Sequence, residues 1–350
     1  MNALQSFVGR QRWWLGRVAV LPLHLLVFAV AAFFLVRAIP GDPAREVVGP
    51  EATEADYLAT KAELGLDGSL WSQLLSYLGD LLHFDLGNAI MTGRPVTTDI
   101  ADRLPGTLEL AGIAFTFLVA VTLFLSAIVV AWPGSLASRA VRGYAQAAGA
   151  VPEFVVGVVG IFLFYATLQV VPAPSGRVRP GLTEPEPITS LPLLDAVLRG
   201  DTVVVSSMAS HLLLPISVLV VSVTPILLKQ LLTALDSSLT AGPTLFKVAT
   251  GSARKYIYLS AYRRALPPTV SLFGMVFGSL LGGAVILETL FGLGGMGTYA
   301  VEAVAATDLI ALQGFLLVVA AISLIVFLCV DLINMLLDPR RKPGRQGGGS

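Results

Sequence analysis

Two groups of residues in this 350-residue chain are of types that elsewhere support chemistry, a set of closely spaced glycines and the histidines. Gly292, Gly294 and Gly297 satisfy G-x-G-x-x-G, which cradles dinucleotide phosphates when a strand precedes it and a helix follows. Here the pattern follows an apolar run without a βαβ unit, so tight turns or close helix approach are the better interpretation. The histidines are far apart in sequence, and neither H-E-x-x-H nor a P-loop pattern occurs. We therefore expect no catalytic centre, no metal and no cofactor bound by this chain.

A third feature is the stretch Gly251–Pro268, which is purely basic and rich in aromatic residues. Its charges are Arg254, Lys255, Arg263 and Arg264, and apolar and aromatic residues interleave with them at helix-like spacing: Tyr256, Ile257, Leu259, Tyr262 and Leu266. Two interpretations are open. The charges either reflect only the topology of a membrane protein, or they form the rim of a short helix that contacts lipid headgroups or a protein partner.

Composition identifies an integral membrane protein. Apolar residues make up 55% of the chain and charged residues only 13%, whereas a soluble domain carries about a quarter charged residues. The mean hydropathy is +0.78. The single cysteine, Cys329, excludes an internal disulfide.

Six apolar runs are long enough to span a bilayer, which takes roughly 20 helical residues. None contains Lys, Arg, Asp or Glu; Glu288 and Asp331 lie at the ends of two runs, where we expect water or headgroups to reach them. Pro215 and Pro225 are expected to break the fourth run. The runs are Val18–Val36, Leu110–Trp132, Phe154–Pro172, Leu212–Leu228, Val270–Leu287 and Leu309–Val330.

The first run is interpreted as an uncleaved span. Arg10, Arg12 and Arg17 precede it, as in a signal peptide, but its apolar core exceeds 7–15 residues and no cleavage site follows closely. Placing the N-terminus in the cytoplasm puts most of the 23 Lys and Arg residues inside and most of the 23 Asp and Glu residues outside. Both termini are therefore expected in the cytoplasm.

This topology divides the chain into five parts. They are a cytoplasmic N-terminus (1–17), a first span (18–37), an extracytoplasmic insertion (38–107), a five-span core (108–338) with a cytoplasmic loop at 229–266, and a cytoplasmic tail (339–350). The ending Gly347–Ser350 is typical of a linker and is left out of the interpretation.

The insertion at 38–107 is acidic and contains two helix signals. Thr53 and Asp56 form a capping-box pattern. Leu70–Leu82 carries apolar residues at i, i+3 and i+4, which predicts an amphipathic helix. This helix either packs on the spans or lies in the membrane interface, or else it is a docking platform for an external partner, with Trp71 and Leu75 as contacts.

The order of motifs resembles that of the inner-membrane permease subunits of ABC importers for dipeptides, oligopeptides and nickel, of the "B" type. The most specific motif is Gly282–Phe291, which includes Gly283 and Glu288 and continues through Gly295 and Gly297. The other matching segments, in order, are Leu35–Pro43, Leu64–Asp67, Phe84–Gly87, Pro95–Val96, Arg103–Leu110, His211–Pro215 and Asp338–Arg340.

The resemblance implies an all-α polytopic fold with six transmembrane helices, the type I ABC importer permease fold. It also implies that the basic stretch belongs to a loop called the EAA loop, whose short coupling helix contacts an ATPase subunit. Gly251 and Pro268 occupy the places of the loop's glycine and of the proline that opens the fifth span. Lys247–Gly251 departs from the family's Ala-rich core, and Gly294 stands where a proline is common. The coupling residues expected are Leu245, Phe246, Lys247, Val248, Ala249, Thr250, Gly251, Ser252, Ala253 and Arg254.

The function implied is that of a non-enzymatic permease subunit in a bacterial cytoplasmic (inner) membrane importer for short peptides. The partners implied are a second homologous permease, two ATPase subunits or domains that bind ATP and Mg, an extracytoplasmic substrate-binding protein and membrane lipid, and no nucleic acid. The residues expected on the translocation side are Gly282, Gly283, Glu288, Phe291, Gly295 and Gly297. A nickel or nickel-chelate permease of the same family, and a non-ABC channel or membrane scaffold, remain alternatives.

Overall fold

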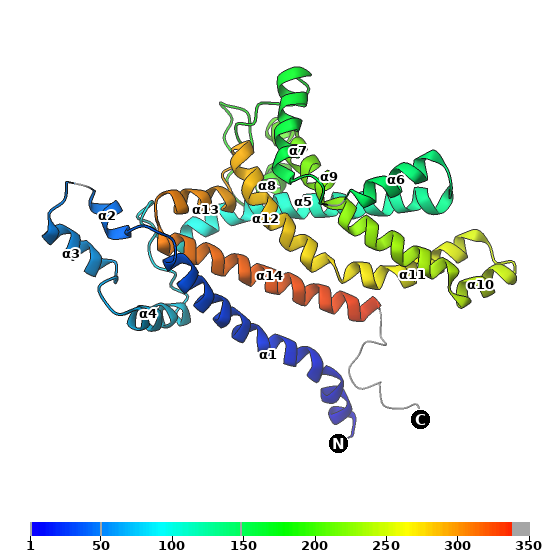
Figure 1. The fold of residues 1–350 in the computed structure, drawn as a ribbon, viewed down its shortest axis with the longest axis horizontal. Coiled ribbons are helices and arrows are strands. Elements are labelled where there is room, and N and C mark those ends of the chain that lie inside the picture. Colours follow the sequence, from blue (N-terminus) through cyan, green and yellow to red (C-terminus); the bar gives the residue numbers. More distant parts are fainter. Residues whose placement is uncertain (1, 50, 148, 338–350) are drawn as a thin grey trace. The chain divides into compact units, whose positions relative to one another are not determined.

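The computed structural model describes residues 2–49, 51–147 and 149–337, with the described side chains between residues 18 and 336. The chain is built of helices (Figure 1), and within these residues no strand forms beyond one isolated bridge between Asn88 and Pro95. The expected tail at 339–350 and the motif Asp338–Arg340 lie outside the described residues. The all-α polytopic fold expected from the sequence is confirmed.

The helices fall into two compact units. The first comprises residues up to 107 together with 293–324, and the second comprises 108–292 together with the described part of the chain from 325. In chain order the helices are α1 (Asn2–Arg37), α2 (Pro43–Val48), α3 (Glu54–Glu63), α4 (Leu70–Leu82), α5 (Val96–Ala131), α6 (Leu136–Gln146), α7 (Glu153–Gly160), the π-helix η1 (Ile161–Thr167), α8 (Pro192–Arg199), α9 (Thr202–Thr240), α10 (Gly242–Ala249), α11 (Arg254–Val270), α12 (Phe273–Phe291), α13 (Met296–Ala305) and α14 (Leu309–Leu337).

Five helices are long and apolar enough to cross a membrane, and they correspond to five of the six expected spans. These are α1, α5, α9, α12 and α14. The third expected span, Phe154–Pro172, is instead a shorter apolar helix over Glu153–Thr167. At about 1.5 Å per residue it covers roughly 22 Å, short of the ~30 Å hydrocarbon core. Its second half, η1, is a π-helix, and it ends where Gln169 takes a left-handed conformation (φ 54°).

The expected break in the fourth span does not occur, because α9 runs unbroken from Thr202 to Thr240 through both prolines. Pro225 has no N–H to donate to the carbonyl of Val221 one turn earlier. The hydroxyl of Tyr144, on α6, donates to that carbonyl instead, at 2.6 Å. A neighbouring helix thus satisfies the acceptor that the proline leaves free.

The segment expected as a loop, 229–266, is almost wholly helical (Figure 1). It comprises the end of α9, all of α10 and most of α11, joined by short turns. The fifth span also begins later than expected: Pro268 lies inside α11, and α12 starts at Phe273 after a turn at Ser271 and Leu272. The consecutive prolines remove two backbone donors near the end of α11, so the helix stops soon after them.

Apolar packing on α9 organises the second unit. Leu231 and Leu235 of α9 pack against Ala261 and Ala265 of α11, while Leu228 and Leu232 pack against Val129 of α5 and Val141 of α6. These alanines and branched residues are buried, so α11 and α6 are fixed along the same end of α9.

In the first unit, α4 packs against the end of α1. The last turn of α1 carries Phe33, which stacks with Tyr77 of α4 at 5.8 Å between ring centroids, and Arg37, which donates to the Gln73 side chain of α4 at 3.0 and 3.1 Å. The expected capping box is confirmed: Asp56 N donates to the Thr53 hydroxyl, and Thr53 N donates to the Asp56 carboxylate. The amphipathic helix predicted at 70–82 is confirmed as α4.

Candidate functional site

The predicted coupling segment is a short helix with an exposed apolar surface. Leu245, Phe246 and Val248 of α10 are 54%, 69% and 55% exposed, and the helix ends in a turn in which Gly251 adopts φ 73°. A positive φ of this kind favours glycine, because it has no Cβ to clash. Thr250, Ser252, Ala253 and Arg254 then lead into α11. Three large apolar side chains in so short an exposed helix are typical of a contact surface.

A buried polar network joins this helix to its neighbours. Thr244 is 1% exposed, and its hydroxyl donates to the Ser238 carbonyl at the end of α9, at 2.7 Å. The guanidinium of Arg264, on α11, donates to the same Thr244 oxygen. One threonine therefore ties α10 to both α9 and α11.

The basic residues of the stretch Gly251–Pro268 have different surroundings. Arg264 is half-buried and bonded to Thr244, whereas Arg254, Lys255 and Arg263 are exposed. The half-buried Tyr262 shares a 2.8 Å hydrogen bond with Ser126 of α5. The stretch is thus partly a structural part of the second unit and partly a charged surface.

Glycines allow α7, α9 and α12 to pack closely. A Cβ on Gly157 of α7 would meet Leu290 Cδ2 of α12 at 2.8 Å, and one on Gly160 would meet Leu214 Cδ1 of α9 at 3.2 Å. The carboxylate of Glu153 lies directly against Gly283, so a Cβ there fits only if Glu153 moves, whereas Gly282 has open space around it. The Gly282–Phe291 motif therefore lies in a tight three-helix contact.

The expectation that water or headgroups reach Glu288 is wrong. Its side chain is 0% exposed in this structure, because the last turn of α12 is packed inside the second unit. The cause is tertiary: α12 continues four residues past Leu287, and α7 packs on that end, where Gly157 lies against Leu287, Leu290 and Phe291.

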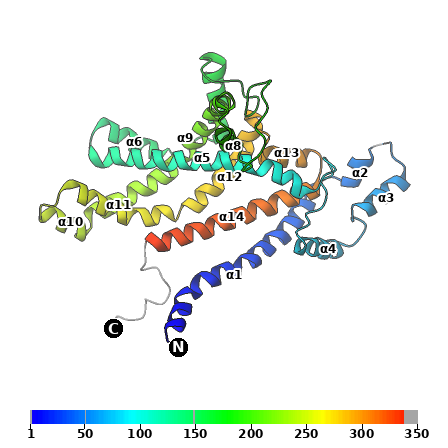
Figure 2. The ribbon, with the colours of Figure 1, turned by 180° about the vertical axis from the view of Figure 1, so that it is seen from behind.

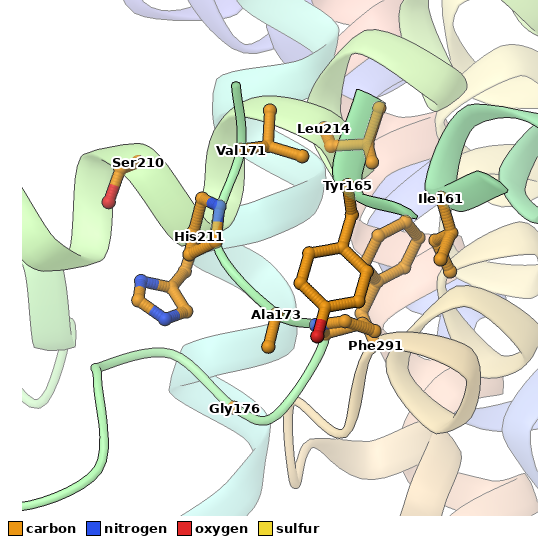
Figure 3. A pocket seen from close by; sticks show the side chains of 11 residues that line it. Ile161, Tyr165, Val171, Ala173, Gly176, Ser210, His211, Leu214 and Phe291 are labelled. Atoms are coloured by element: carbon orange, nitrogen blue, oxygen red, sulfur yellow. The ribbon is translucent and has the colours of Figure 1, made fainter. Parts of the chain in front are cut away.

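A small cavity lies beside the end of this motif (Figure 3). It has a volume of about 10 Å³, enough for roughly one water molecule. Phe291 and Tyr165 line one side of it and His211 the other, and His211 is held by a 2.7 Å contact from Nδ1 to the Ser207 carbonyl. Among the described residues, no three His, Cys, Asp or Glu side chains gather closely enough to hold a metal ion.

The glycine-rich turn after the motif belongs to two units. Gly292 ends α12 with φ 65°, and Gly294 has the same φ, which accords with the tight-turn interpretation of these glycines. In the first unit, Gly295 precedes α13 and Gly297 lies in its first turn; the Met296 amide between them donates to the Thr107 hydroxyl of α5 at 2.9 Å.

The same end of α5 makes a second contact with α13. Arg103 lies over the ring of the buried Tyr299, 5.1 Å from its centroid, and pairs with Glu302 at 2.9 Å. Arg103 and Thr107 both come from the Arg103–Leu110 motif quoted for the family resemblance. The motif therefore fixes α13, which the sequence did not predict.

The outer contact residues predicted from the sequence are both exposed. Trp71 is 70% and Leu75 69% exposed on α4, although Leu74 between them is buried. Trp71 also touches Phe34 of α1 edge-on, with centroids 6.3 Å apart. Its exposure fits any partner with an apolar surface, and its docking role stays a prediction.

Three functional details were missed because they depend on distant contacts. Glu109 accepts hydrogen bonds from the Leu193 and Leu194 amides at 3.0 Å and so caps α8, more than 80 residues away in sequence. Glu153 packs on Gly283, and Arg264 binds Thr244. The sequence could have marked these residues as unusual, because each is a charged side chain among apolar neighbours. No rule of sequence spacing, however, identifies a partner so far away in the chain.

Comparison with protein families identifies two matching models. Residues 122–343 match the binding-protein-dependent transport system inner membrane component. Residues 11–111 match the N-terminal region of a binding-protein-dependent transport system membrane component. Together they account for most of the chain.

Individual relatives align over nearly the whole length. A probable D,D-dipeptide transport system permease, DdpB of Escherichia coli K12, is 36% identical over 340 residues, 97% of this chain and 98% of its own. A putative peptide transport system permease of Brucella abortus is 30% identical over 332 residues, 93% of this chain and 97% of its own. The dipeptide permease DppB of E. coli K12 is 29% identical over 330 residues, 93% of this chain and 97% of its own.

Proposed function

Because the chain belongs to the family of binding-protein-dependent transport system inner-membrane components, we propose that it is the permease subunit of an ATP-driven importer of short peptides. The membership covers both halves of the chain and makes it a multi-pass membrane protein. The substrate class is supported by relatives that are named as dipeptide and peptide permeases and align over more than nine-tenths of this chain.

The exposed apolar surface of α10 is the observation that carries the coupling proposal. Its three large side chains, on Leu245, Phe246 and Val248, face away from a helix that is anchored through Thr244. Lys247 and Arg254 give this surface a basic rim. A surface of this kind suits insertion into a groove of a separate ATPase subunit.

The anchoring would allow force to pass from α10 into the spans. Because Thr244 ties α10 to α9 and α11, a push on α10 moves the ends of both helices rather than bending a loop. α11 leads directly into α12, and α12 packs through glycines against α7 and α9. Of the residues proposed for the translocation side, Gly282, Gly283, Glu288 and Phe291 lie on α12 along this route, and Gly295 and Gly297 follow them in the chain.

The working importer would contain a second homologous permease, two ATPase subunits or domains that hold ATP and Mg, and an extracytoplasmic substrate-binding protein. Binding of ATP would close the ATPase pair and open the path outward, since a ligand shifts an equilibrium only through its different affinity for the two states. Hydrolysis would reset the path. Both termini and α10 would lie on the cytoplasmic side, where most of the basic residues then fall.

A charge placed in the α10 surface tests the proposal. Phe246→Asp in the complete importer, reconstituted in proteoliposomes, should abolish most of the ATPase stimulation by binding protein and peptide uptake, because a carboxylate replaces the most exposed apolar contact of α10. Phe246→Leu is the matched control, since it keeps an apolar side chain and should retain most of the activity. Undiminished stimulation and uptake in Phe246→Asp would refute the coupling role.

A further inference from the structure

The first unit contains an apolar groove between α1, α4 and α14. Its volume is about 570 Å³, and its lining is apolar apart from Thr97. Leu25 and Ala29 come from α1, Leu81 and Leu82 from α4, and Leu317 from α14. Figure 2 shows α1 and α14 running beside one another in this unit. None of the side chains that line the groove is ionisable.

The groove lies at the depth of the membrane interior. Ala29 is roughly 12 Å along the helix axis from Arg37, at about 1.5 Å per residue, and Leu317 is the same distance from the start of α14 at Leu309. Both helices are long and apolar enough to span a bilayer, and only 11% of each spanning window is buried within the chain. Most of the surface around the groove therefore faces outward at hydrocarbon depth.

Helix α4 lines the groove with Leu78, Leu81 and Leu82 and presents two different exposed sides. Trp71, Leu75 and Leu82 are 70%, 69% and 81% exposed and form an apolar side. Ser72, Ser76, Asp80 and His83 recur at helical spacing and form an exposed polar side. A helix with adjoining apolar and polar exposed sides is suited to the plane where hydrocarbon meets headgroups.

The apolar side of α4 continues into the exposed surface of α1. Trp71 contacts Phe34, which is itself 41% exposed, and the neighbouring Leu35 is 59% exposed. Arg37 marks the end of the span and is held by Gln73 of α4. Trp71 thus lies at the level where aromatic residues gather at membrane interfaces.

We propose that this groove is a lipid site: α4 lies at the headgroup boundary of the leaflet on its own side, and an acyl chain of that leaflet occupies the groove between α1 and α14. An apolar cavity of this size does not hold water stably, because it offers no polar partners. Acyl chains are the small apolar groups that surround the spans at that depth. The exposed apolar side of α4, including Trp71 and Leu75, then contacts lipid.

Fluorescence quenching of Trp71 tests the position of α4. Trp13, Trp14 and Trp132, together with the tryptophans of the partner subunits and of the binding protein, are replaced by Phe, and the complete importer is placed in lipid nanodiscs. Phosphatidylcholine brominated on its acyl chains should lower Trp71 emission about twofold or more, iodide in water should quench it weakly, and added binding protein should leave both results unchanged. Strong iodide quenching without bromolipid quenching, or protection of Trp71 by the binding protein, would overturn the proposal; protection would assign the surface to protein docking.

Filling the groove tests the bound acyl chain. Ala321→Phe adds a ring to a residue that lines the groove, and Ala320→Phe adds the same ring next to it, outside the lining. Native mass spectrometry of the detergent-purified importer should show fewer retained phospholipids for Ala321→Phe than for the control and the parent. Equal retention in all three would overturn the acyl-chain site. If Ala321→Phe fails to assemble, the quenching of Trp71 decides the outcome.

Discussion

The contact between Tyr144 and Val221 makes a sharp prediction about how α9 tolerates a proline in its interior. Pro225 leaves the Val221 carbonyl without its helical donor, and the Tyr144 hydroxyl takes that place at 2.6 Å. Tyr144→Phe removes only the hydroxyl and keeps the ring, which packs against Leu228 and Val141. The free energy of unfolding should therefore fall through the hydrogen bond alone.

The expected loss is about 1 kcal/mol. An intramolecular hydrogen bond contributes about 0.5–1.5 kcal/mol in general, while hydrogen bonds between helices in membranes average about 0.6 kcal/mol. The second figure lowers the expectation, because this bond lies between two helices of a membrane protein. Unfolding of the purified protein by SDS in mixed micelles, followed by intrinsic fluorescence, measures the difference.

A second substitution identifies the cause. Pro225→Ala restores the N–H that bonds to the Val221 carbonyl, so Tyr144→Phe should cost little in that background. The coupling energy of the double-mutant cycle should be close to the full ~1 kcal/mol. An equal cost of Tyr144→Phe with and without Pro225 would refute the assignment, since the hydroxyl would then act through some other group.

Three further predictions concern α10, the glycine contacts and the outer insertion. In a thermal unfolding assay, Thr244→Val should lower stability by about 1–3 kcal/mol, because Arg264 loses its acceptor and α10 loses its link to Ser238. Thr250→Val, at an exposed residue, is the control in the same assay. Gly157→Ala should lower the free energy of unfolding by about 1–3 kcal/mol, because the added methyl group forces α7 away from Leu290. Gly143→Ala on α6 is the control: its methyl group meets nothing within 4 Å, so the change should be neutral or stabilising by up to about 1 kcal/mol. A larger loss of stability for Gly143→Ala than for Gly157→Ala would contradict the packing. Hydrogen bonds from the Thr53 hydroxyl and amide lower the pKa of Asp56. The capping box therefore stabilises α3 fully above the usual carboxyl pKa of about 3.9, and this stabilisation is lost as pH falls through the lower pKa of the folded state. Hydrogen exchange of α3 should therefore rise relative to α4 in acid, and Thr53→Val should show that rise already at neutral pH; an unchanged ratio would refute it.

Signals that lie within a few residues of one another in the sequence predicted several helices correctly. The capping box at Thr53 and the apolar spacing of 70–82 produced α3 and α4 where expected, because caps and amphipathic faces are encoded within a few residues. The apolar runs located five membrane helices for the same reason. The third expected span came out shorter because its π-helical half ends at Thr167.

The sequence predicted which segment forms the candidate site, but it did not predict how the residues of that segment are arranged. Leu245–Arg254 was identified through the family resemblance, and the basic stretch after it, whose apolar residues recur at helix-like spacing, forms helix α11. Composition could not distinguish Arg264 from Arg263: one is bonded to Thr244 and the other is exposed. Which charge becomes structural depends on the neighbour that tertiary packing brings to it.

The sequence by itself determined that this protein is helical, membrane-embedded and a member of a permease family, because hydropathy, charge placement and motif order are properties of the linear chain. Tertiary structure alone decided that α9 passes through Pro225 intact, that Glu288 is buried, and that Thr244 joins three helices. The physical reason is the same in each case. A donor, an acceptor or a covering side chain arrives from a helix far away in sequence, and no local pattern records it.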